Sequence, residues 1–351
     1  IDGKTIIQHV VEMFPGEEDI TFICNSDHLK EPEYRMQEIL EEIAPKGKII
    51  AINPHKLGPV HAVLQIIDQL DLNKPTIVNY ADFTCDWDYI DFCSMVQKTE
   101  CDGAIPCYRG FHPHTIWSNY YAYVQEEQMC AWDIQEKKPF TNSPREEFAS
   151  SGTYYFRSGE LMQHYFEQCV VKDLTVNGEY YVSMAYKPMM KDRLNIQVYE
   201  LEHFMQWGTP ADFEEYRYWS NTFRSILDEQ EPPKHKGALI LPMVGLGSRF
   251  QKEGYETPKP LITVSNRPMA AQAFMDLPQT ERQRFILRSN LKDIDKLQNA
   301  LREHARSAEF TILDYMTDGQ ATTCVAGATG LAIDRPVTIA ACDNGMIYDA
   351  S

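Results

Sequence analysis

The amino-acid sequence predicts an α/β protein in which a mixed sheet flanked by helices occurs twice. Short apolar segments alternate with segments of helical spacing along the first part of the chain, as is typical of strands joined by helices. In addition, Gly58 and Asp82 have the same separation as Gly319 and Asp343, with a helix and an apolar strand between the members of each pair. This recurrence indicates two copies of one fold.

The first copy starts with alternating helices and strands and continues with an antiparallel extension. In the alternating part we expect helices at 4–14, 32–43, 58–70 and 89–97 and strands at 20–24, 48–52 and 76–81. In the extension we expect strands at 103–108, 120–125, 129–135, 151–156 and 196–201, helices at 159–168 and 181–191, and a helix that begins at Pro210.

A charged, proline-bearing stretch at residues 220–236 is typical of a connection between domains. It divides the chain into a first domain at 1–219 and the N-terminal part of a second at 237–351, which starts with an apolar strand at 238–241.

Further features of the two copies fall in the same register. The separation of Asp82 and Asp88 equals that of Asp343 and Asp349, and the strand at 48–52 corresponds to residues 309–313. The first copy lacks a glycine loop of its own, and the second stops soon after Asp343. We therefore expect an excerpt of a longer tandem protein, with a natural truncation as the alternative.

The overall charge restricts the partners. The formal net charge is -18 and the isoelectric point is near 5.0, so the protein would repel nucleic acid and anionic membranes. A local basic pocket for a nucleotide is still allowed, because salt confines electric fields to about 8 Å.

The cysteines and the apolar runs favour a cytoplasmic protein. The nine cysteines include no CxxC pair, and several lie in apolar runs where a free thiol packs as a small hydrophobe. The sequence has no secretory leader and no apolar run of about 18 residues, so we expect neither secretion nor a membrane span.

The strand at 238–241 runs into a glycine-rich turn with two nearby cations. Gly245 and Gly247 have no Cβ, so backbone N–H groups can approach an anion closely. Ser248 adds a hydroxyl donor, and Arg249 adds a charged fork that suits phosphate oxygens. Lys259 stands between two prolines that stiffen its backbone. The stretch predicts a phosphate-binding loop, and the alternative is a structural turn with surface cations.

The segment GLGSRF followed by PKPL resembles the signature of nucleoside-triphosphate transferases, the sugar-1-phosphate nucleotidyltransferase superfamily, and in particular its capsule-biosynthesis members. It lacks the Gly-Lys-Ser/Thr ending of a Walker A loop and the third glycine of a dinucleotide fingerprint. The resemblance implies the Rossmann-like mixed sheet of the nucleotide-diphospho-sugar transferase fold, here in two tandem copies that are each incomplete. It also implies that Arg249 and Lys259 are catalytic and that the nucleotide is contacted by Gly245, Leu246, Gly247, Ser248, Arg249, Phe250 and Lys259.

Two aspartates are candidate metal ligands. Asp82 ends a buried strand, where open α/β sheets place ligand-binding groups, and Asp343 is its counterpart. The resemblance implies that both hold Mg²⁺, which prefers few protein oxygens together with substrate phosphates. Helix capping is the alternative for these two aspartates and the favoured role for Asp88. Many relatives carry a second metal-binding aspartate where this chain has Gln206, and an amide is a poorer Mg²⁺ ligand.

The segment DGQA resembles the part of the family that contacts the nucleotide base, which implies this role for Gly319, Gln320 and Ala321. The first copy keeps the glycine as Gly58 but not the glutamine. A glycine at a helix start also has a purely structural explanation.

Three segments of the first copy resemble the acceptor side of the family. EKKP would place Glu136 and Lys137 against the sugar phosphate, although by charge pattern alone it is a solvated turn. SSGTYYF, which contains Gly152, resembles the sugar-side glycine strand, and NGEYY would place Glu179 near the acceptor. His112-Pro113-His114 invites a metal assignment, but two histidines without a third ligand are more often loop residues.

The implied reaction joins a nucleoside triphosphate to a phosphorylated sugar or similar small phosphate ester and releases pyrophosphate. A glycosyltransferase of related fold is one alternative, and a non-catalytic nucleotide-binding regulatory pair is another. The sequence does not decide whether the protein forms homo-oligomers. It also does not decide whether an excerpt is active in which neither copy carries both the nucleotide-side and the acceptor-side motifs.

Overall fold

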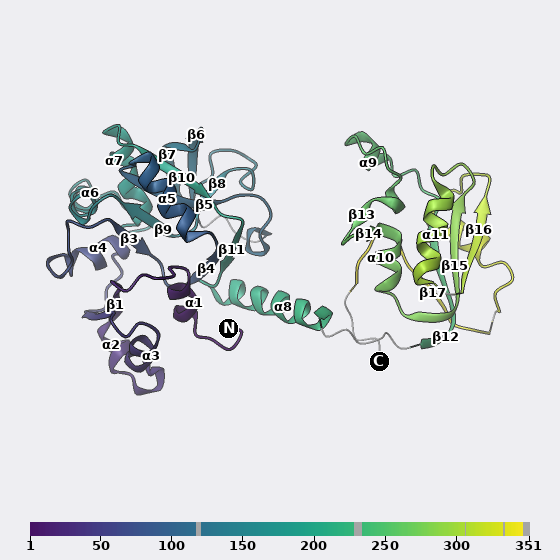
Figure 1. Ribbon diagram of the computed structural model, residues 1–351, viewed down its shortest axis with the longest axis horizontal. Coiled ribbons are helices and arrows are strands. Elements are labelled where there is room, and N and C mark those ends of the chain that lie inside the picture. Colours follow the sequence, from purple (N-terminus) through teal and green to yellow (C-terminus); the bar gives the residue numbers. More distant parts are fainter. Residues whose placement is uncertain (117–120, 228–233, 306, 333, 347–351) are drawn as a thin grey trace. The chain divides into compact units, whose positions relative to one another are not determined.

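The computed structural model describes residues 1–351 except 117–120, 228–233, 306, 333 and 347–351. Asp349, the expected counterpart of Asp88, lies outside the described residues. Contacts within the chain define two compact units, unit 1 at Ile1–Asn221 and unit 2 at Thr222–Ser351 (Figure 1). Helix α8 (Pro210–Leu227) and strand β12 (Lys234–Met243) extend into the stretch at 220–236 that was expected to be a connection.

Unit 1 begins with a small parallel pair of strands and its helices, drawn in purple in Figure 1. The elements are α1 (Ile6–Glu12), β1 (Thr21–Asn25), α2 (Ser26–Lys30), α3 (Met36–Ile43) and β2 (Lys48–Ile52). The helix expected at 32–43 is interrupted at Arg35, whose left-handed φ of 46° separates a short 3₁₀ helix from α3. Helix α2 was not predicted, because its polar sequence is nucleated by the Asn25 side chain, which accepts a hydrogen bond from the Asp27 N–H at 2.8 Å.

The next part of unit 1 leads into its main sheet. It contains α4 (Pro59–Leu64), β3 (Thr76–Asn79), β4 (Phe83–Asp86) and α5 (Tyr89–Thr99). The Asp88 side chain accepts a hydrogen bond from the Asp91 N–H at 2.9 Å, so the prediction that Asp88 caps a helix is confirmed.

The main sheet has seven strands in the order β10-β7-β6-β8-β5-β9-β3. The strands not yet named are β5 (Gly103–Tyr108), β6 (Ala122–Glu127), β7 (Cys130–Glu136), β8 (Phe148–Ser150), β9 (Thr153–Phe156) and β10 (Ile196–Glu200). Parallel and antiparallel pairs both occur, which confirms a mixed α/β fold.

The sheet differs from the open sheet that was expected, because β10 also pairs with β5 and five strands thereby close into a ring. The strand expected at 151–156 corresponds to β9, and the short strand β8, which was not predicted, precedes it across Gly152, where φ is 100°. Strand β8 pairs with both β5 and β6, and the β6–β7 hairpin pairs with β10.

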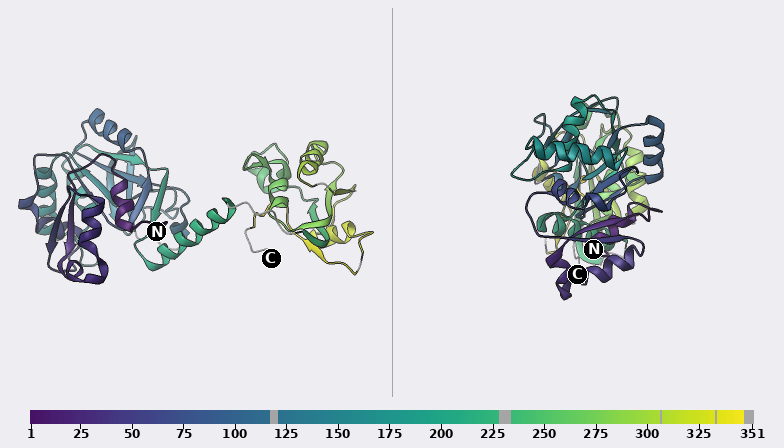
Figure 2. Two further views of the ribbon diagram at one scale, coloured as in Figure 1. Left: turned by 60° about the horizontal axis from the view of Figure 1, so that its bottom comes forward. Right: turned by 90° about the vertical axis from the view of Figure 1, so that its left-hand side faces the viewer.

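Two helices and a second strand pair complete unit 1 (Figure 2). Helices α6 (Gly159–Val171) and α7 (Tyr186–Lys191) cover the main core, in which Phe156, Phe166 and Tyr186 are fully buried. Strand β11 (His203–Gln206), which was not predicted, pairs antiparallel with β4. In the described part of the chain, no helix is long and apolar enough to cross a lipid bilayer.

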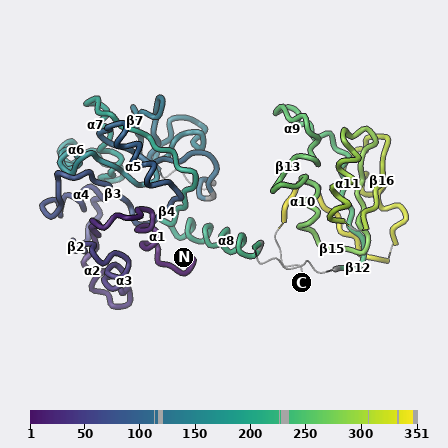
Figure 3. The backbone as a smooth tube through the Cα atoms, in the orientation of Figure 1, coloured from purple at the N-terminus to yellow at the C-terminus, as the bar shows by residue number. Residues whose placement is uncertain are grey.

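Unit 2 is a parallel sheet in the order β16-β15-β12-β17 with helices on both faces (Figure 3). Besides β12 it contains α9 (Ser248–Lys252), β13 (Thr263–Val264), β14 (Arg267–Pro268), α10 (Met269–Met275), β15 (Gln279–Arg288), α11 (Ile294–His304), β16 (Ala308–Leu313), α12 (Gln320–Gly327) and β17 (Val337–Ile339). Leu239 and Leu241 of β12 pack with α10 and α11, whereas Ile240 packs with α12. The alternation explains why β12 reads as a continuous apolar run.

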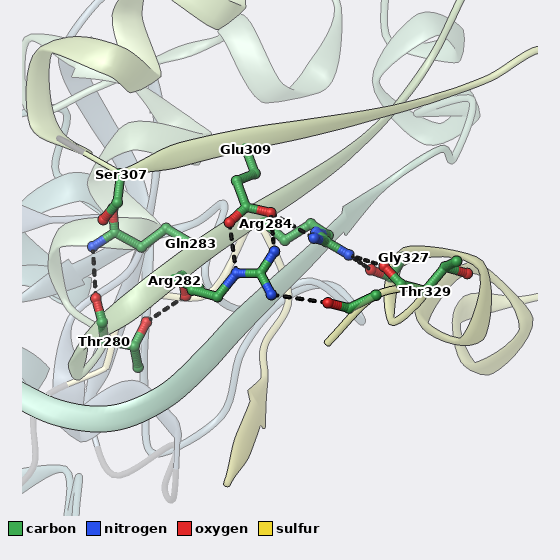
Figure 4. Close-up of polar contacts among 9 residues, drawn as sticks. Thr280, Arg282, Gln283, Arg284, Ser307, Glu309, Gly327 and Thr329 are labelled. Atoms are coloured by element: carbon green, nitrogen blue, oxygen red, sulfur yellow. Dashed lines mark hydrogen bonds and ion pairs between the residues drawn. The ribbon is translucent and has the colours of Figure 1, made fainter. Parts of the chain in front are cut away.

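A network of two arginines and one glutamate fixes the end of α12 to the sheet (Figure 4). Arg284 is buried and donates to the carbonyl oxygens of Gly327 at 2.7 Å and Thr329 at 2.5 Å. Its guanidinium and that of Arg282 both bind the Glu309 carboxylate, at 2.5 and 2.7 Å. These hydrogen bonds, that from Arg282 first, lower the pKa of Glu309 to about 2.

Candidate active site

The glycine loop of unit 2 follows directly from the buried strand β12. Leu239 and Leu241 are fully buried, whereas Gly245 and Leu246 are exposed, so the chain leaves the core at the carboxyl end of the strand. Gly247 has a φ of 65°, a conformation that favours glycine. A Cβ at this position would lie 3.1 Å from the Cβ of Lys259. The glycine therefore allows the loop to pack closely against Lys259.

Lys259 in turn contacts Asp343, which stands 84 residues further along the chain. The Lys259 ammonium forms a hydrogen-bonded ion pair with Asp343 Oδ2 and lies 5.8 Å from the centre of the Phe250 ring. The fold of unit 2 thus gathers the glycine loop, the candidate phosphate-binding lysine and the candidate metal ligand in one place. Next to Asp343, burial raises the pKa of the Cys342 thiol to about 11, so this side chain adds no charge at neutral pH.

Arg249 and the residues expected to contact the base are exposed. Arg249 lies in the first turn of α9, and within the part of the chain that the structure describes it forms no ion pair. Gly319 precedes α12, and its carbonyl oxygen accepts hydrogen bonds from the Thr323 N–H at 3.1 Å and the Thr323 hydroxyl at 3.0 Å. Gln320 and Ala321 follow it at the exposed start of the helix. Their contact with a base remains a prediction.

In unit 1, the candidate metal ligand Asp82 lies beside Gln206. The pairing of β11 with β4 places Gln206 opposite Phe83, and the Trp207 N–H donates to the Asp82 carbonyl oxygen at 2.9 Å. Both side chains border Gly208, because a Cβ there would lie 2.6 Å from Asp82 Oδ2 and 2.7 Å from Gln206 Nε2. Gly208 was not singled out from the sequence, although it stands two residues after Gln206.

Burial raises the pKa of Asp82, with the nearby Asp212 charge acting in the same direction. The residue as a whole is nevertheless exposed to solvent, so water screens the carboxylate and opposes this effect.

The acceptor-side residues of unit 1 form a polar cluster with two sets of hydrogen bonds. Glu136 ends β7 and accepts a hydrogen bond from the Ser183 hydroxyl at 2.6 Å. The Lys137 ammonium donates to the Tyr181 hydroxyl at 2.5 Å, and this hydroxyl donates to Glu179 Oε2. Burial raises the pKa of Glu136, and the hydrogen bond from Ser183 partly offsets this effect.

Two glycines hold the backbone around this cluster. Gly58 has a φ of 86°, and a Cβ there would lie 2.8 Å from both the N and O atoms of Tyr180. The Tyr180 N–H donates to the Leu57 carbonyl oxygen at 2.9 Å, so the segment with Gly58 runs directly against the segment with Glu179. Gly152 packs under Phe83 and Tyr80, whose rings would lie 3.0 and 3.1 Å from a Cβ.

Tyr181 and Ser183 were not singled out from the sequence. Both follow Glu179 closely in the segment GEYYVS, but Val182–Ala185 forms a short 3₁₀ helix, so no strand period marks their placement.

The two histidines at 112 and 114 lie in a buried aromatic cluster. His114 Nε2 is 3.0 Å from the Tyr108 hydroxyl, and burial lowers the pKa of His114 to about 3. Among the residues that the structure describes, no three His, Cys, Asp or Glu side chains are grouped as metal ligands. Asp82 and Asp343 offer carboxylate oxygens, the ligand type that Mg²⁺ prefers, and their role as metal ligands remains a prediction.

No family model matches the sequence, and no curated protein matches it. Among solved structures, the chain is similar to a nucleoside-diphosphate-sugar pyrophosphorylase from Vibrio cholerae RC9, with 15% identity, a TM-score of 0.48, and coverage of 61% of this chain and 87% of that one. It is similar to a UDP-glucose pyrophosphorylase complexed with UDP-glucose, with 18% identity, a TM-score of 0.48, and coverage of 64% and 88%. A third similar structure is CTP:phosphocholine cytidylyltransferase from Streptococcus pneumoniae, with 14% identity, a TM-score of 0.45, and coverage of 63% and 87%. Similarity at this level does not decide an activity.

Proposed function

We propose that the two units are incomplete tandem copies of a nucleotidyltransferase domain, which joins a nucleoside triphosphate to a phosphorylated sugar or similar phosphate ester. The observation that supports this most is the ion pair of Lys259 and Asp343 beside the glycine loop. The loop, the lysine and the aspartate were assigned to one triphosphate site from separate parts of the sequence, and they lie together. A cytoplasmic role in making capsule polysaccharide precursors belongs to the same proposal.

In the proposed reaction, a phosphate oxygen of the acceptor attacks the α-phosphorus of the triphosphate. The bond from the α-phosphorus to the bridging oxygen breaks, and pyrophosphate leaves. The nucleophile is already anionic, so catalysis depends on positioning and charge neutralisation rather than on a strong base. The loop N–H groups and Arg249 bind the triphosphate, and Lys259 neutralises its charge. Mg²⁺ held by Asp343, or by Asp82 in the first copy, would add further neutralisation at the reacting phosphate.

On the acceptor side, Lys137 would bind the acceptor's phosphate, and Glu136 and Glu179 would accept hydrogen bonds from its hydroxyl groups. The contacts of Lys137 and Glu179 with the Tyr181 hydroxyl hold both side chains in place before the acceptor arrives. Such prior positioning lowers the entropy cost of binding.

Isothermal titration calorimetry with the four nucleoside triphosphates, each with and without Mg²⁺, tests the proposal on the full chain. We expect one triphosphate to bind, and we expect Lys259→Ala to weaken its binding about 10- to 100-fold, because a hydrogen bond to a charged group contributes about 1.5–3 kcal/mol. Lys296→Ala, in an exposed lysine of α11, is the matched control and should leave binding unchanged. Absence of binding by all four triphosphates, or equal binding by the two variants, would refute the proposed site.

A further inference from the structure

Arg288 ends strand β15 between the two segments of unit 2 that are expected to contact a nucleotide. It follows Leu287, which pairs with Met243 of β12, and it pairs with Leu313 at the end of β16. The glycine loop begins soon after Met243, and the segment DGQA follows soon after Leu313. Arg288 belongs to neither segment and was not singled out from the sequence.

The alternation of side chains along β15 places Arg288 on the face of the sheet that α12 covers. Ile286 packs in one cluster with Cys324 of α12, whereas Leu287 packs in the cluster on the opposite face. Residues two apart in a strand share a face, so the side chains of Arg284, Ile286 and Arg288 point to the same side.

Arg288 also lies at about the level where α12 begins. Arg284 marks the other end of this helix, because it donates to the Gly327 carbonyl oxygen at 2.7 Å. Arg288 stands four residues further along the strand, about 13 Å at the usual rise, and the 8 residues of α12 span about 12 Å. Since α12 runs back from the end of β16, its start with Gly319 and Gln320 lies near Arg288.

Arg284 and Arg288 differ in the partners of their guanidinium groups. Arg284 donates to two backbone carbonyl oxygens and to the Glu309 carboxylate. In the part of the chain that the structure describes, the Arg288 side chain donates only to Met316 Sδ, at 3.2 Å from Nη1, and a thioether sulfur is a weak acceptor. Its Nε is buried and has no hydrogen-bond partner among those residues. Because buried donors are nearly always paired, the Arg288 guanidinium is suited to an acceptor that a ligand supplies.

Large apolar side chains are exposed in the segments on both sides of Arg288. Leu246 lies in the glycine loop after β12, and Tyr315 and Met316 follow β16. Their exposed fractions are 54%, 53% and 50%. A nucleobase stacks on surfaces of this kind with its faces, while its edge accepts hydrogen bonds from a planar donor fork.

We propose that Arg288 selects the base of the bound nucleoside triphosphate and favours a base whose edge presents two adjacent acceptors. Guanine presents O6 and N7, and cytosine presents O2 and N3, whereas donors and acceptors alternate along the edges of adenine and uracil. A guanidinium has donors only, so it binds the first kind of edge with two hydrogen bonds and meets a donor on the second. This inference rests on the proposed function, because it takes the triphosphate site at Lys259 as given.

Isothermal titration calorimetry of the full chain with GTP, CTP, ATP and UTP tests the preference. We expect GTP or CTP to bind most tightly, about 5- to 150-fold more tightly than ATP and UTP, which is the usual discrimination of a two-hydrogen-bond contact with a base. Arg288→Ala should remove this preference. Arg302→Ala, at an exposed arginine of α11 on the opposite face of the sheet, is the matched control and should keep it.

Base analogues that lack one acceptor separate base recognition from a merely structural role. The analogue is 7-deaza-GTP if GTP binds most tightly and 3-deaza-CTP if CTP does. The parent should bind the analogue at least about 5-fold more weakly than the natural nucleotide, and Arg288→Ala should bind the two equally. A structural role would weaken the binding of both nucleotides in the variant and leave their ratio unchanged. If Arg288→Ala does not fold, the two nucleotides on the unaltered protein still decide.

Three results would overturn the inference and leave the triphosphate site at Lys259 intact. These are tightest binding of ATP or UTP, equal binding of the natural nucleotide and its analogue by the parent, and an unchanged base preference in Arg288→Ala. Absence of binding by all four triphosphates would instead refute the proposed function, and the inference with it.

Discussion

Replacement of Gly58 by alanine should destabilise unit 1 strongly, because two independent costs add at this position. Its φ of 86° disfavours any L-residue, at a cost of about 1–2 kcal/mol. The new Cβ would also lie 2.8 Å from the N and O atoms of Tyr180, and backbone atoms cannot rotate away as a side chain does. Overpacking of this kind costs about 1–3 kcal/mol. We therefore expect a loss of about 2–5 kcal/mol, reduced by a few tenths through the smaller entropy of the unfolded alanine chain.

Gly178→Ala is the matched control for this substitution. Gly178 has a similar φ of 82°, but nothing lies within 4 Å of the position of its Cβ. It should therefore lose only the conformational part, about 1–2 kcal/mol. The difference between the two variants isolates the close approach of the Gly58 segment to Tyr180.

Tryptophan fluorescence in a urea titration measures both variants within the intact chain. All five tryptophans belong to unit 1, so their emission follows the unfolding of this unit alone. They are Trp87, Trp117, Trp132, Trp207 and Trp219. Equal losses of unfolding free energy in Gly58→Ala and Gly178→Ala would refute the reasoning, because the contact with Tyr180 would then cost nothing.

Two further predictions concern pH. The pKa of Glu309 is lowered to about 2 in the folded protein. Its contribution to stability is therefore present above the unfolded pKa near 4.3 and is lost as the pH falls from about 5 toward 2. Unfolding followed by circular dichroism should show that the unfolding free energy depends less on pH in Glu309→Gln than in the parent. The pKa of His114 is lowered to about 3, so the unfolded state takes up a proton below pH 6.5 while the folded state does not. Unit 1 should therefore lose about 2 kcal/mol of unfolding free energy from this group between pH 6.5 and 5. Tryptophan fluorescence should show that His114→Phe removes this part of the loss, and an unchanged pH dependence of the unfolding free energy would contradict the assignment.

The sequence predicted those elements whose signals are local. Strands β2 and β5 have the bounds that the apolar runs indicated, and the Asp88 cap follows from a residue type placed directly before a helix. Strands β4 and β11 were missed because each is only four residues long and they are stabilised by pairing with each other across a large separation in the chain. No local pattern carries that information.

In the candidate site, too, local features could be predicted from the sequence and long-range contacts could not. The loop with Gly247 could be recognised by its residues, but its contact with Lys259 and that of Lys259 with Asp343 depend on tertiary structure. The closure of the main sheet could not be predicted either, because it depends on the pairing of β10 with both β7 and β5, which lie far from β10 in the sequence.

The two aspartates at corresponding strand ends differ in what surrounds them. Asp343 meets the ammonium group of Lys259, which the chain delivers after β12 and its loop. Asp82 lies near the amide of Gln206 and the bare backbone of Gly208, and burial raises its pKa. A cation beside Asp82, as Lys259 stands beside Asp343, would favour the ionised carboxylate and lower its pKa.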